Sequence, residues 1–299
     1  MSTVVALGGN ALIRAGERGT AAEQLANLRR AVAALRPLIG EPRLVITHGN
    51  GPQVGNELLR QERAAEEAPP LPLWLAVAQT QAEIGALISA ELRPELVGRE
   101  PACVLTHVRV AEDDPAFERP TKPIGPFYSE EEAGRLERGR GWAMVSDANR
   151  GFRRLVPSPE PLQIVELDVV RRLADGNAVV IACGGGGIPV VHRNGRLVGV
   201  DAVIDKDRAS ALLARGLEAK RLLILTEVPA VYRRFGEPDQ EAILQLSRSD
   251  AERFLPKLAE GSMRPKLESA LAFGGETLIT NFESLEDALA GRAGTRIGP

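Results

Sequence analysis

Residues 3–10 read TVVALGGN, and this stretch decides the fold class. The run Thr3–Leu7 is short and rich in β-branched and apolar residues. It stops at two glycines, which is typical of a buried strand followed by a tight turn. Glycine lets backbone N–H groups approach a phosphate closely. The stretch therefore predicts a buried strand that ends at a turn suited to phosphate.

The same pattern returns twice further along the chain. A strand at 43–47 is followed by His48-Gly49-Asn50-Gly51-Pro52, and a strand at 178–182 is followed by four glycines at 184–187. One such cluster is most simply a tight turn. Three at corresponding points predict a ligand site, because ligands of open α/β sheets bind outside the carboxyl ends of the strands. None of the clusters has the spacing of a Walker A loop or of Gly-x-Gly-x-x-Gly.

Helical periodicity alternates with these strands, at 21–39, 73–92, 164–174, 205–216 and 265–273. This alternation predicts an α/β protein with a mainly parallel sheet that helices cover on both faces. Residues 102–110 read as one further strand, and 190–200 as a hairpin, since Asn194-Gly195 is a strong turn signal. Residues 111–161 are rich in proline, glycine and charge. They break the rhythm and predict a small inserted subdomain.

Bulk properties exclude several classes of protein. The 299 residues carry a formal net charge of −3, so no basic field invites nucleic acid. No apolar run is long enough for a membrane span, and residues 1–9 lack the features of a signal peptide. We therefore expect a cytoplasmic protein that binds neither nucleic acid nor membrane. Cys103 and Cys183 each adjoin an apolar run, and we expect both to be buried free thiols.

Lysine is rare in this chain, which has 37 basic residues of which only five are lysine: Lys122, Lys206, Lys220, Lys257 and Lys266. A lysine ammonium fits among phosphate oxygens as a compact charge, whereas arginine presents a broad planar fork. Lys220 and Lys257 stand in ordinary amphipathic surroundings. The other three stand in unusual local sequences and predict ammonium groups that converge on a phosphoryl group.

Other polar and aromatic residues leave two interpretations open. Asp205-Lys206-Asp207 is either a capped helix start or a pair of carboxylates that hold lysines between two phosphates. Tyr232 and Phe235 either pack against a purine or cover the core. The three histidines have no metal-ligand spacing and are expected to be structural, with His48 as a possible site-lining residue.

Taken together, these motifs resemble the carbamate kinase family of the amino-acid kinase superfamily, over residues 4 to about 297. The segment PTKPIGPFY at 120–128 is especially specific and falls within the predicted insertion. The matching stretches are VVALGGNAL at 4–12, THGNGPQVG at 47–55, RPTKPIGPFYSEEEA at 119–133, RGFRRLVPSPEP at 150–161, GGGGIPV at 184–190, GVDAVIDKDRAS at 199–210 and EGSMRPK at 260–266.

The resemblance implies a three-layer αβα sandwich with a large, mainly parallel central sheet and a small protruding subdomain. It implies one domain over 1–299, in which 111–161 form the inserted subdomain. Residues 1–200 would mainly bind carbamoyl phosphate, and residues 201–299 would mainly bind the nucleotide. The implied reaction is reversible phosphoryl transfer between carbamoyl phosphate and ADP, giving ATP and carbamate, with Mg²⁺ carried by the nucleotide.

The resemblance also implies roles for individual residues. Substrate would bind at Gly8, Gly9, Asn10, Gly49, Asn50 and Gly51. Catalysis would rest on Lys122, Lys206, Asp207 and Lys266, and the nucleotide would lie near Glu227, Tyr232 and Met263. No protein ligand to a metal is expected.

Two other functions remain as alternatives: a related kinase for a different small carboxylate or phosphate, and a catalytically silent nucleotide-binding protein. We also expect a homodimer, partly from the resemblance and partly because the helix at 73–88 is more apolar than a surface helix needs.

Overall fold

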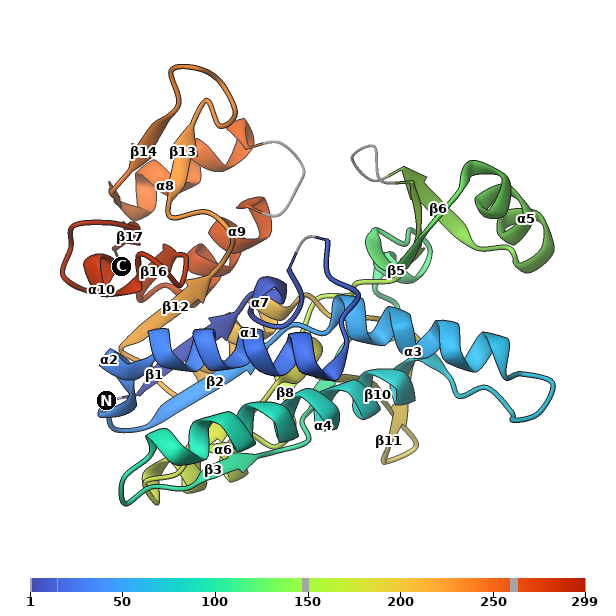
Figure 1. Ribbon diagram of the computed structural model, residues 1–299, viewed down its shortest axis with the longest axis horizontal. Coiled ribbons are helices and arrows are strands. Elements are labelled where there is room, and N and C mark those ends of the chain that lie inside the picture. The colour runs from blue at the N-terminus through green and yellow to red at the C-terminus, as the bar shows by residue number, and fades with distance from the viewer. Residues whose placement is uncertain (1, 15, 147–150, 259–262, 299) are drawn as a thin grey trace.

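The computed structural model describes residues 2–14, 16–146, 151–258 and 263–298, and its largest sheet runs through the middle of the molecule (Figure 1). The strand order is β15-β17-β16-β12-β1-β2-β9-β3, and adjacent strands are parallel except for β16 and β17. The strands are β1 (Thr3–Leu7), β2 (Leu44–His48), β3 (Pro101–Cys103), β9 (Val179–Ile181), β12 (Arg221–Leu225), β15 (Gln245–Leu246), β16 (Glu276–Thr280) and β17 (Thr295–Ile297).

Helices cover both faces of this sheet, because its central strands are apolar on both sides. Val4 and Ala6 of β1 face one helical layer, and Val5 and Leu7 face the other. The first layer contains α6 (Leu167–Asp175), α7 (Lys206–Gly216), α8 (Arg248–Phe254) and α9 (Met263–Phe273); the second contains α1 (Ala21–Ala34), α2 (Arg36–Ile39), α4 (Leu73–Leu92) and α10 (Leu285–Leu289). The predicted three-layer αβα sandwich is confirmed.

A second, four-stranded sheet lies beside the first, in the order β11-β10-β4-β8. Its strands are β4 (His107–Arg109), β8 (Gln163–Ile164), β10 (Ile188–Arg193) and β11 (Arg196–Gly199). The hairpin of β10 and β11 is confirmed, with positive φ at Asn194 and Gly195.

The single strand predicted over 102–110 is wrong, because the chain leaves the main sheet after β3 and joins the second sheet at β4. Side chains fix this crossing at the buried Thr106. Its N–H donates to Gln81 Oε1 at 2.6 Å, and its hydroxyl accepts a bond of 3.1 Å from the Cys183 N–H. Apolar character alone does not reveal where a run changes sheets.

The protruding subdomain carries a three-stranded sheet, β5-β7-β6, and one helix. It projects from the sandwich and contacts it next to α3 (Gly51–Arg63) (Figure 1). Gly55 of α3 touches Gly125 so closely that a Cβ there would lie 2.2 Å from the Gly125 Cα. The subdomain elements are β5 (Lys122–Tyr128), α5 (Glu130–Arg140), β6 (Ala143–Ser146) and β7 (Phe152–Val156). The division of substrate and nucleotide binding at residue 200 stays a prediction.

Shorter elements complete the chain. A hairpin of β13 and β14 extends from the C-terminal part of the sandwich (Figure 1). These elements are η1 (Gly9–Ala11), η2 (Arg93–Glu95), η3 (Pro115–Phe117), η4 (Gly184–Gly186), η5 (Leu255–Lys257), β13 (Val231–Arg233) and β14 (Glu241–Ile243).

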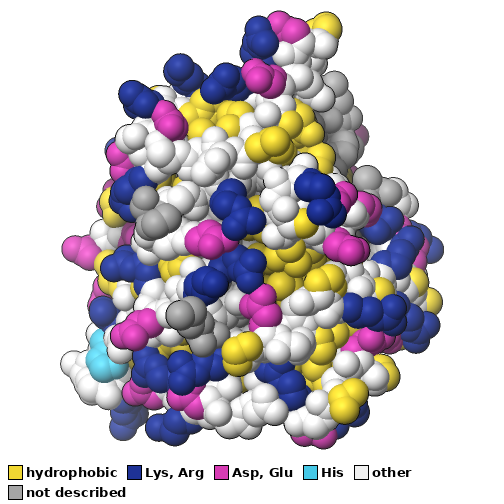
Figure 2. Space-filling model, turned by 90° about the vertical axis from the view of Figure 1, so that its left-hand side faces the viewer, with side chains coloured by type: hydrophobic (Ala, Val, Ile, Leu, Met, Phe, Trp, Pro, Cys, Tyr) yellow, Lys and Arg dark blue, Asp and Glu magenta, His cyan; other side chains and the backbone are white. Residues whose placement is uncertain are grey.

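Surface properties agree only in part with the expectations. Cys183 is buried, but Cys103 is exposed, because β3 is the edge strand of the main sheet. The face shown in Figure 2 intersperses basic and acidic side chains rather than gathering one sign of charge. No helix in the described part of the chain has the length and apolarity needed to cross a bilayer.

Candidate active site

Three of the five lysines converge, although they come from three different elements. Lys122 begins β5, Lys206 begins α7, and Lys266 lies in the first turn of α9. Asp207 joins two of them: one carboxylate oxygen contacts the Lys206 ammonium, and the other accepts a bond of 3.0 Å from Lys266 Nζ. Lys122 reaches the cluster through Asp205, whose Oδ2 lies 2.6 Å from Lys122 Nζ. All four predicted catalytic residues therefore lie in one network, in which two groups of ion pairs are joined by the bond from the Asp207 N–H to Asp205 and by the charge interactions of Asp205 with Lys206 and Lys266.

Asp205 belongs to this network, although sequence reasoning did not select it as a site residue. Its Oδ1 caps α7 by accepting bonds from the N–H groups of Asp207 at 2.9 Å and Arg208 at 3.3 Å. Its Oδ2 is thereby free to hold Lys122, which is 83 residues distant in sequence. The Asp-Lys-Asp motif is therefore a helix cap and also an arrangement of carboxylates around lysines. That these lysines lie between two phosphates stays a prediction.

The charges of this network depend on one another because the network is largely buried. Burial lowers the pKa of Lys206, and the charge of Asp207 offsets only part of that effect. Burial also acts against the charge of Lys266, but the charge and hydrogen bond of Asp207 outweigh it and raise the pKa of Lys266. Burial alone would raise the pKa of Asp207, yet the two lysines keep that pKa below its ordinary value. Asp207 thus keeps two ammonium groups close together.

The three glycine turns lie at the carboxyl ends of adjacent parallel strands β1, β2 and β9. A Cβ on Gly9 or Gly51 would meet no described atom within 4 Å, so both positions face open space. The turn after β2 also reaches the lysines, since a Cβ on Gly49 would lie 3.6 Å from the Lys206 Cδ. The turn after β2 and the lysine network therefore adjoin each other at the carboxyl ends of the strands.

The start of α3 is open to an anion. Asn50 is the N-cap residue, but its side chain does not cap the helix. Instead, Asn50 Nδ2 donates to Thr80 Oγ1 at 2.9 Å, which turns the amide away from the helix N-terminus. Uncapped N–H groups at a helix N-terminus attract negative charge. For Asn10, the other predicted asparagine, the side chain lies outside what the structure describes.

The predicted nucleotide residues lie on the C-terminal side of the network. Glu227 follows β12. Burial acts to lower the pKa of Lys266, whereas the two aspartates raise it, and the charge of Glu227 raises it further by a smaller amount. Met263 begins α9, in the same turn as Lys266, whereas residues 259–262 of that motif lie outside the described residues. Tyr232 lies in β13 and contacts Phe235, with the ring centroids 5.9 Å apart. Phe235 is 66% exposed and so does not cover the core.

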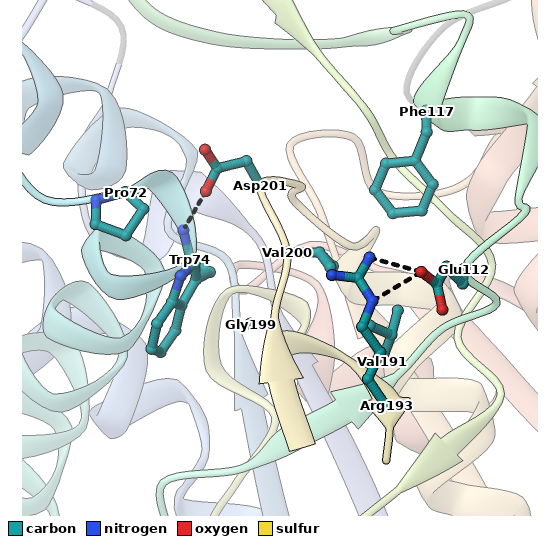
Figure 3. A pocket seen from close by; sticks show the side chains of 9 residues that line it. All are labelled: Pro72, Trp74, Glu112, Phe117, Val191, Arg193, Gly199, Val200 and Asp201. Atoms are coloured by element: carbon teal, nitrogen blue, oxygen red, sulfur yellow. Dashed lines mark hydrogen bonds and ion pairs between the residues drawn. The ribbon is translucent and has the colours of Figure 1, made fainter. Parts of the chain in front are cut away.

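A separate cavity of about 510 Å³ does not contain the lysines (Figure 3). Trp74 of α4 and Phe117 of η3 lie on opposite sides of it, and the β10–β11 hairpin lies between them. Arg193 and Glu112 form an ion pair of 2.7 Å within its lining. None of its lining residues is a predicted site residue.

Metal ligands are not clustered in the parts of the chain that the structure describes. Within those ranges, no group of three or more His, Cys, Asp and Glu side chains is arranged to hold a metal ion.

His48 ends β2 directly before the second glycine turn and is 0% exposed. Burial, with a smaller contribution from the charge of Lys206, lowers the pKa of His48 from 6.5 to about 4, although a hydrogen bond to Gly49 acts in the opposite direction. The native protein therefore holds this imidazole uncharged at neutral pH.

This burial predicts a loss of stability in mild acid. The unfolded chain takes up a proton on His48 below pH 6.5, while the folded chain does so only near pH 4. The contribution is therefore complete above pH 6.5 and is lost as the pH falls towards 4, by about 3 kcal/mol in total. Urea unfolding should show that, as the pH falls from 6.5 towards 4, the unfolding free energy of the wild type decreases by more than that of His48→Asn. A difference between the two proteins that is independent of pH would contradict the prediction.

Comparison with known proteins agrees with this architecture. The family model described as "Amino acid kinase family" matches residues 1–277. A carbamate kinase of Halobacterium salinarum is 46% identical, with 99% of this chain and 98% of that protein covered. The solved structure of carbamate kinase from Giardia lamblia bound to citric acid has a TM-score of 0.92 and 37% identity, covering 99% and 97% of the two chains. The same Giardia enzyme bound to AMP-PNP has a TM-score of 0.89 and 39% identity, covering 99% and 98%. The chain belongs to the amino acid kinase family and, within it, to the carbamate kinases.

Proposed function

We propose that the protein is an ATP:carbamate phosphotransferase, which transfers a phosphoryl group reversibly between carbamoyl phosphate and ADP and gives ATP and carbamate. The observation that carries the proposal is the ion-pair network in which Lys122, Lys206 and Lys266 converge around two aspartates. Phosphoryl transfer depends on positioning and on charge neutralisation more than on covalent chemistry of the protein. Three converging ammonium groups, one of them beside the Gly49 turn, supply both requirements.

The reaction needs no proton to be moved by the protein. An oxygen of the ADP β-phosphate forms a bond to phosphorus, while the bond from phosphorus to the carbamate oxygen breaks and its electron pair leaves with carbamate. Both sides of the reaction carry the same total charge. The site therefore has to hold the transferring phosphoryl group and stabilise its charge as it passes between two oxygens.

Each part of the site has a role in this proposal. Lys206 and Lys266 neutralise the oxygens of the phosphoryl group, and Asp207 orients these two lysines. Lys122 brings a third positive charge from the subdomain. The turns after β1 and β2 bind the phosphoryl group and carbamate through Gly8, Gly9, Asn10, Gly49, Asn50 and Gly51.

We propose that the nucleotide lies near Glu227, Tyr232 and Met263, with its phosphates towards Lys266. The AMP-PNP complex of the Giardia relative supports a nucleotide as a ligand of this chain. Mg²⁺ would enter with the nucleotide, since it binds readily through phosphate oxygens and water with few protein ligands.

A coupled assay for ATP formation from ADP and carbamoyl phosphate tests the function directly. Turnover with carbamoyl phosphate but not with acetyl phosphate or other acyl phosphates would support the proposal. Turnover only with another phosphoryl donor would favour the related kinase, and ADP binding without turnover would favour the silent binding protein.

The cellular setting is part of the proposal. We infer a cytoplasmic enzyme that works mainly towards ATP, as in arginine fermentation. Assembly as a homodimer also stays a prediction, for which light scattering at micromolar protein is the measurement. Several apolar side chains of α4 on which that expectation rested are buried within the subunit, including Val77 and Ile84.

A further inference from the structure

His48 is a buried polar residue to which the proposed reaction assigns no task. Its ring lies between two glycine turns, the one it precedes and the one after β9. A Cβ on Gly184 would come within 2.3 Å of His48 Nε2, so the ring packs directly against the backbone of that turn. The neighbouring Asn50 packs in the same way, since a Cβ on Gly185 would lie 2.2 Å from Asn50 Nδ2. The two turns therefore meet through His48 and Asn50.

The hydrogen bond of His48 defines its tautomer. Nδ1 lies 3.1 Å from the carbonyl oxygen of Gly49, which can only accept, so Nδ1 carries the hydrogen. Nε2 is then the atom with the lone pair, and it has no hydrogen-bond partner among the described residues. A proton on Nε2 would thus add an unpartnered charge in the neighbourhood of Lys206.

This bond also orients the next peptide group. In a trans peptide the C=O of Gly49 and the N–H of Asn50 point in opposite directions, so a carbonyl held against His48 turns the Asn50 N–H away from the ring. The N–H of Gly49 already donates to the Leu7 carbonyl at 3.3 Å. The donors left to this turn are therefore the N–H groups of Asn50 and Gly51, at the open start of α3.

We propose that His48 is a positioning residue for phosphoryl transfer, whose Nδ1–H holds the Gly49 carbonyl and so aims the Asn50 N–H at the transferring group. The inference rests on the proposed function and gives the histidine a part in it. The imidazole acts through orientation and stays uncharged throughout the reaction, which has no proton for it to carry.

Three substitutions separate the two nitrogens. The amide of Asn can donate from the place of Nδ1, so His48→Asn keeps the bond to Gly49. The longer amide of Gln reaches the place of Nε2, so His48→Gln loses that bond, and His48→Leu loses both nitrogens. His192→Asn, at an exposed histidine of β10, is the matched control.

We expect His48→Asn and His192→Asn to keep kcat near that of the wild type. We expect His48→Gln and His48→Leu to lose about 10-fold to 100-fold in kcat with carbamoyl phosphate, because a misplaced donor at a reaction site has effects of that size. The Kd for ADP alone should change little in all four variants. Circular dichroism identifies any variant that fails to fold. If His48→Leu does not fold, the comparison of His48→Asn with His48→Gln still tests the inference.

Two results would overturn the inference. Equal kcat for His48→Asn, His48→Gln and His48→Leu would show that the ring only fills space between the two turns. A loss in His48→Asn together with a pH profile that differs from that of the wild type between pH 6 and 8 would indicate proton transfer by His48. Absence of ATP formation by the wild type would instead refute the proposed function, so the two failures are distinguishable.

Discussion

Replacing Asp207 with asparagine is expected to lower kcat by about 10²-fold to 10³-fold while the protein stays folded. The Asp207 carboxylate contacts both Lys206 and Lys266, and without its charge two buried ammonium groups would face each other. Like charges in a buried site shift one pKa strongly, so one lysine should lose its proton. The transferring group would then lose part of its charge neutralisation.

Steady-state kinetics with varied carbamoyl phosphate and saturating ADP measure this effect. Asp168→Asn is a matched control, because that carboxylate on α6 is 76% exposed and pairs with Arg171. We also expect the kcat of Asp207→Asn to recover partly at lower pH, where both lysines are protonated again. An unfolded Asp207→Asn protein would show that the residue acts mainly in the fold, and normal kcat would refute its role.

Replacing Lys122 with alanine is expected to have the second-largest effect, a loss of about 10²-fold in kcat with weaker use of carbamoyl phosphate. Lys122 lies on the proline-rich strand β5 of the subdomain, and its ammonium reaches the network through Asp205 at 2.6 Å. Its charge is thus added from outside the sandwich. Affinity for ADP alone should stay nearly unchanged, because the proposed nucleotide residues belong to the C-terminal part of the chain.

Lys122→Arg should recover little activity, because a broad guanidinium does not fit a place that a compact ammonium occupies. Lys220→Ala is the matched control, at an exposed lysine outside the network. Near-normal kinetics of Lys122→Ala would show that Lys122 is a surface charge without a catalytic task. A parallel loss of ADP affinity would show that the subdomain holds the whole site together instead.

Local sequence was sufficient for most of the sandwich. The helix predicted at 73–92 forms over those residues, because its apolar faces pack against both the sheet and the subdomain. The strand-and-glycine patterns at 3–10 and 43–51 also form as predicted. Such patterns succeed because neighbouring residues decide backbone geometry, and a strand buried on both faces needs apolar side chains throughout.

For residues outside these patterns, the position in the fold depends on contacts with residues that are remote in sequence. The run at 102–110 divides between two sheets because Thr106 is bonded to Gln81 and Cys183, which are remote in sequence. Cys103 is exposed because β3 forms the edge of the sheet. The order of strands in a sheet depends on contacts between distant parts of the chain, so the apolar character of one run does not predict it.

The sequence by itself determined the fold class, the three glycine turns and the identity of the three unusual lysines, because these depend on residue type and local spacing. Only the tertiary structure decided how the lysines are held. Asp205 binds Lys122 with one oxygen and caps α7 with the other, and Asp207 lies between Lys206 and Lys266. These contacts join β5, α7 and α9, and charges so far apart along the chain meet only when the core between them has packed.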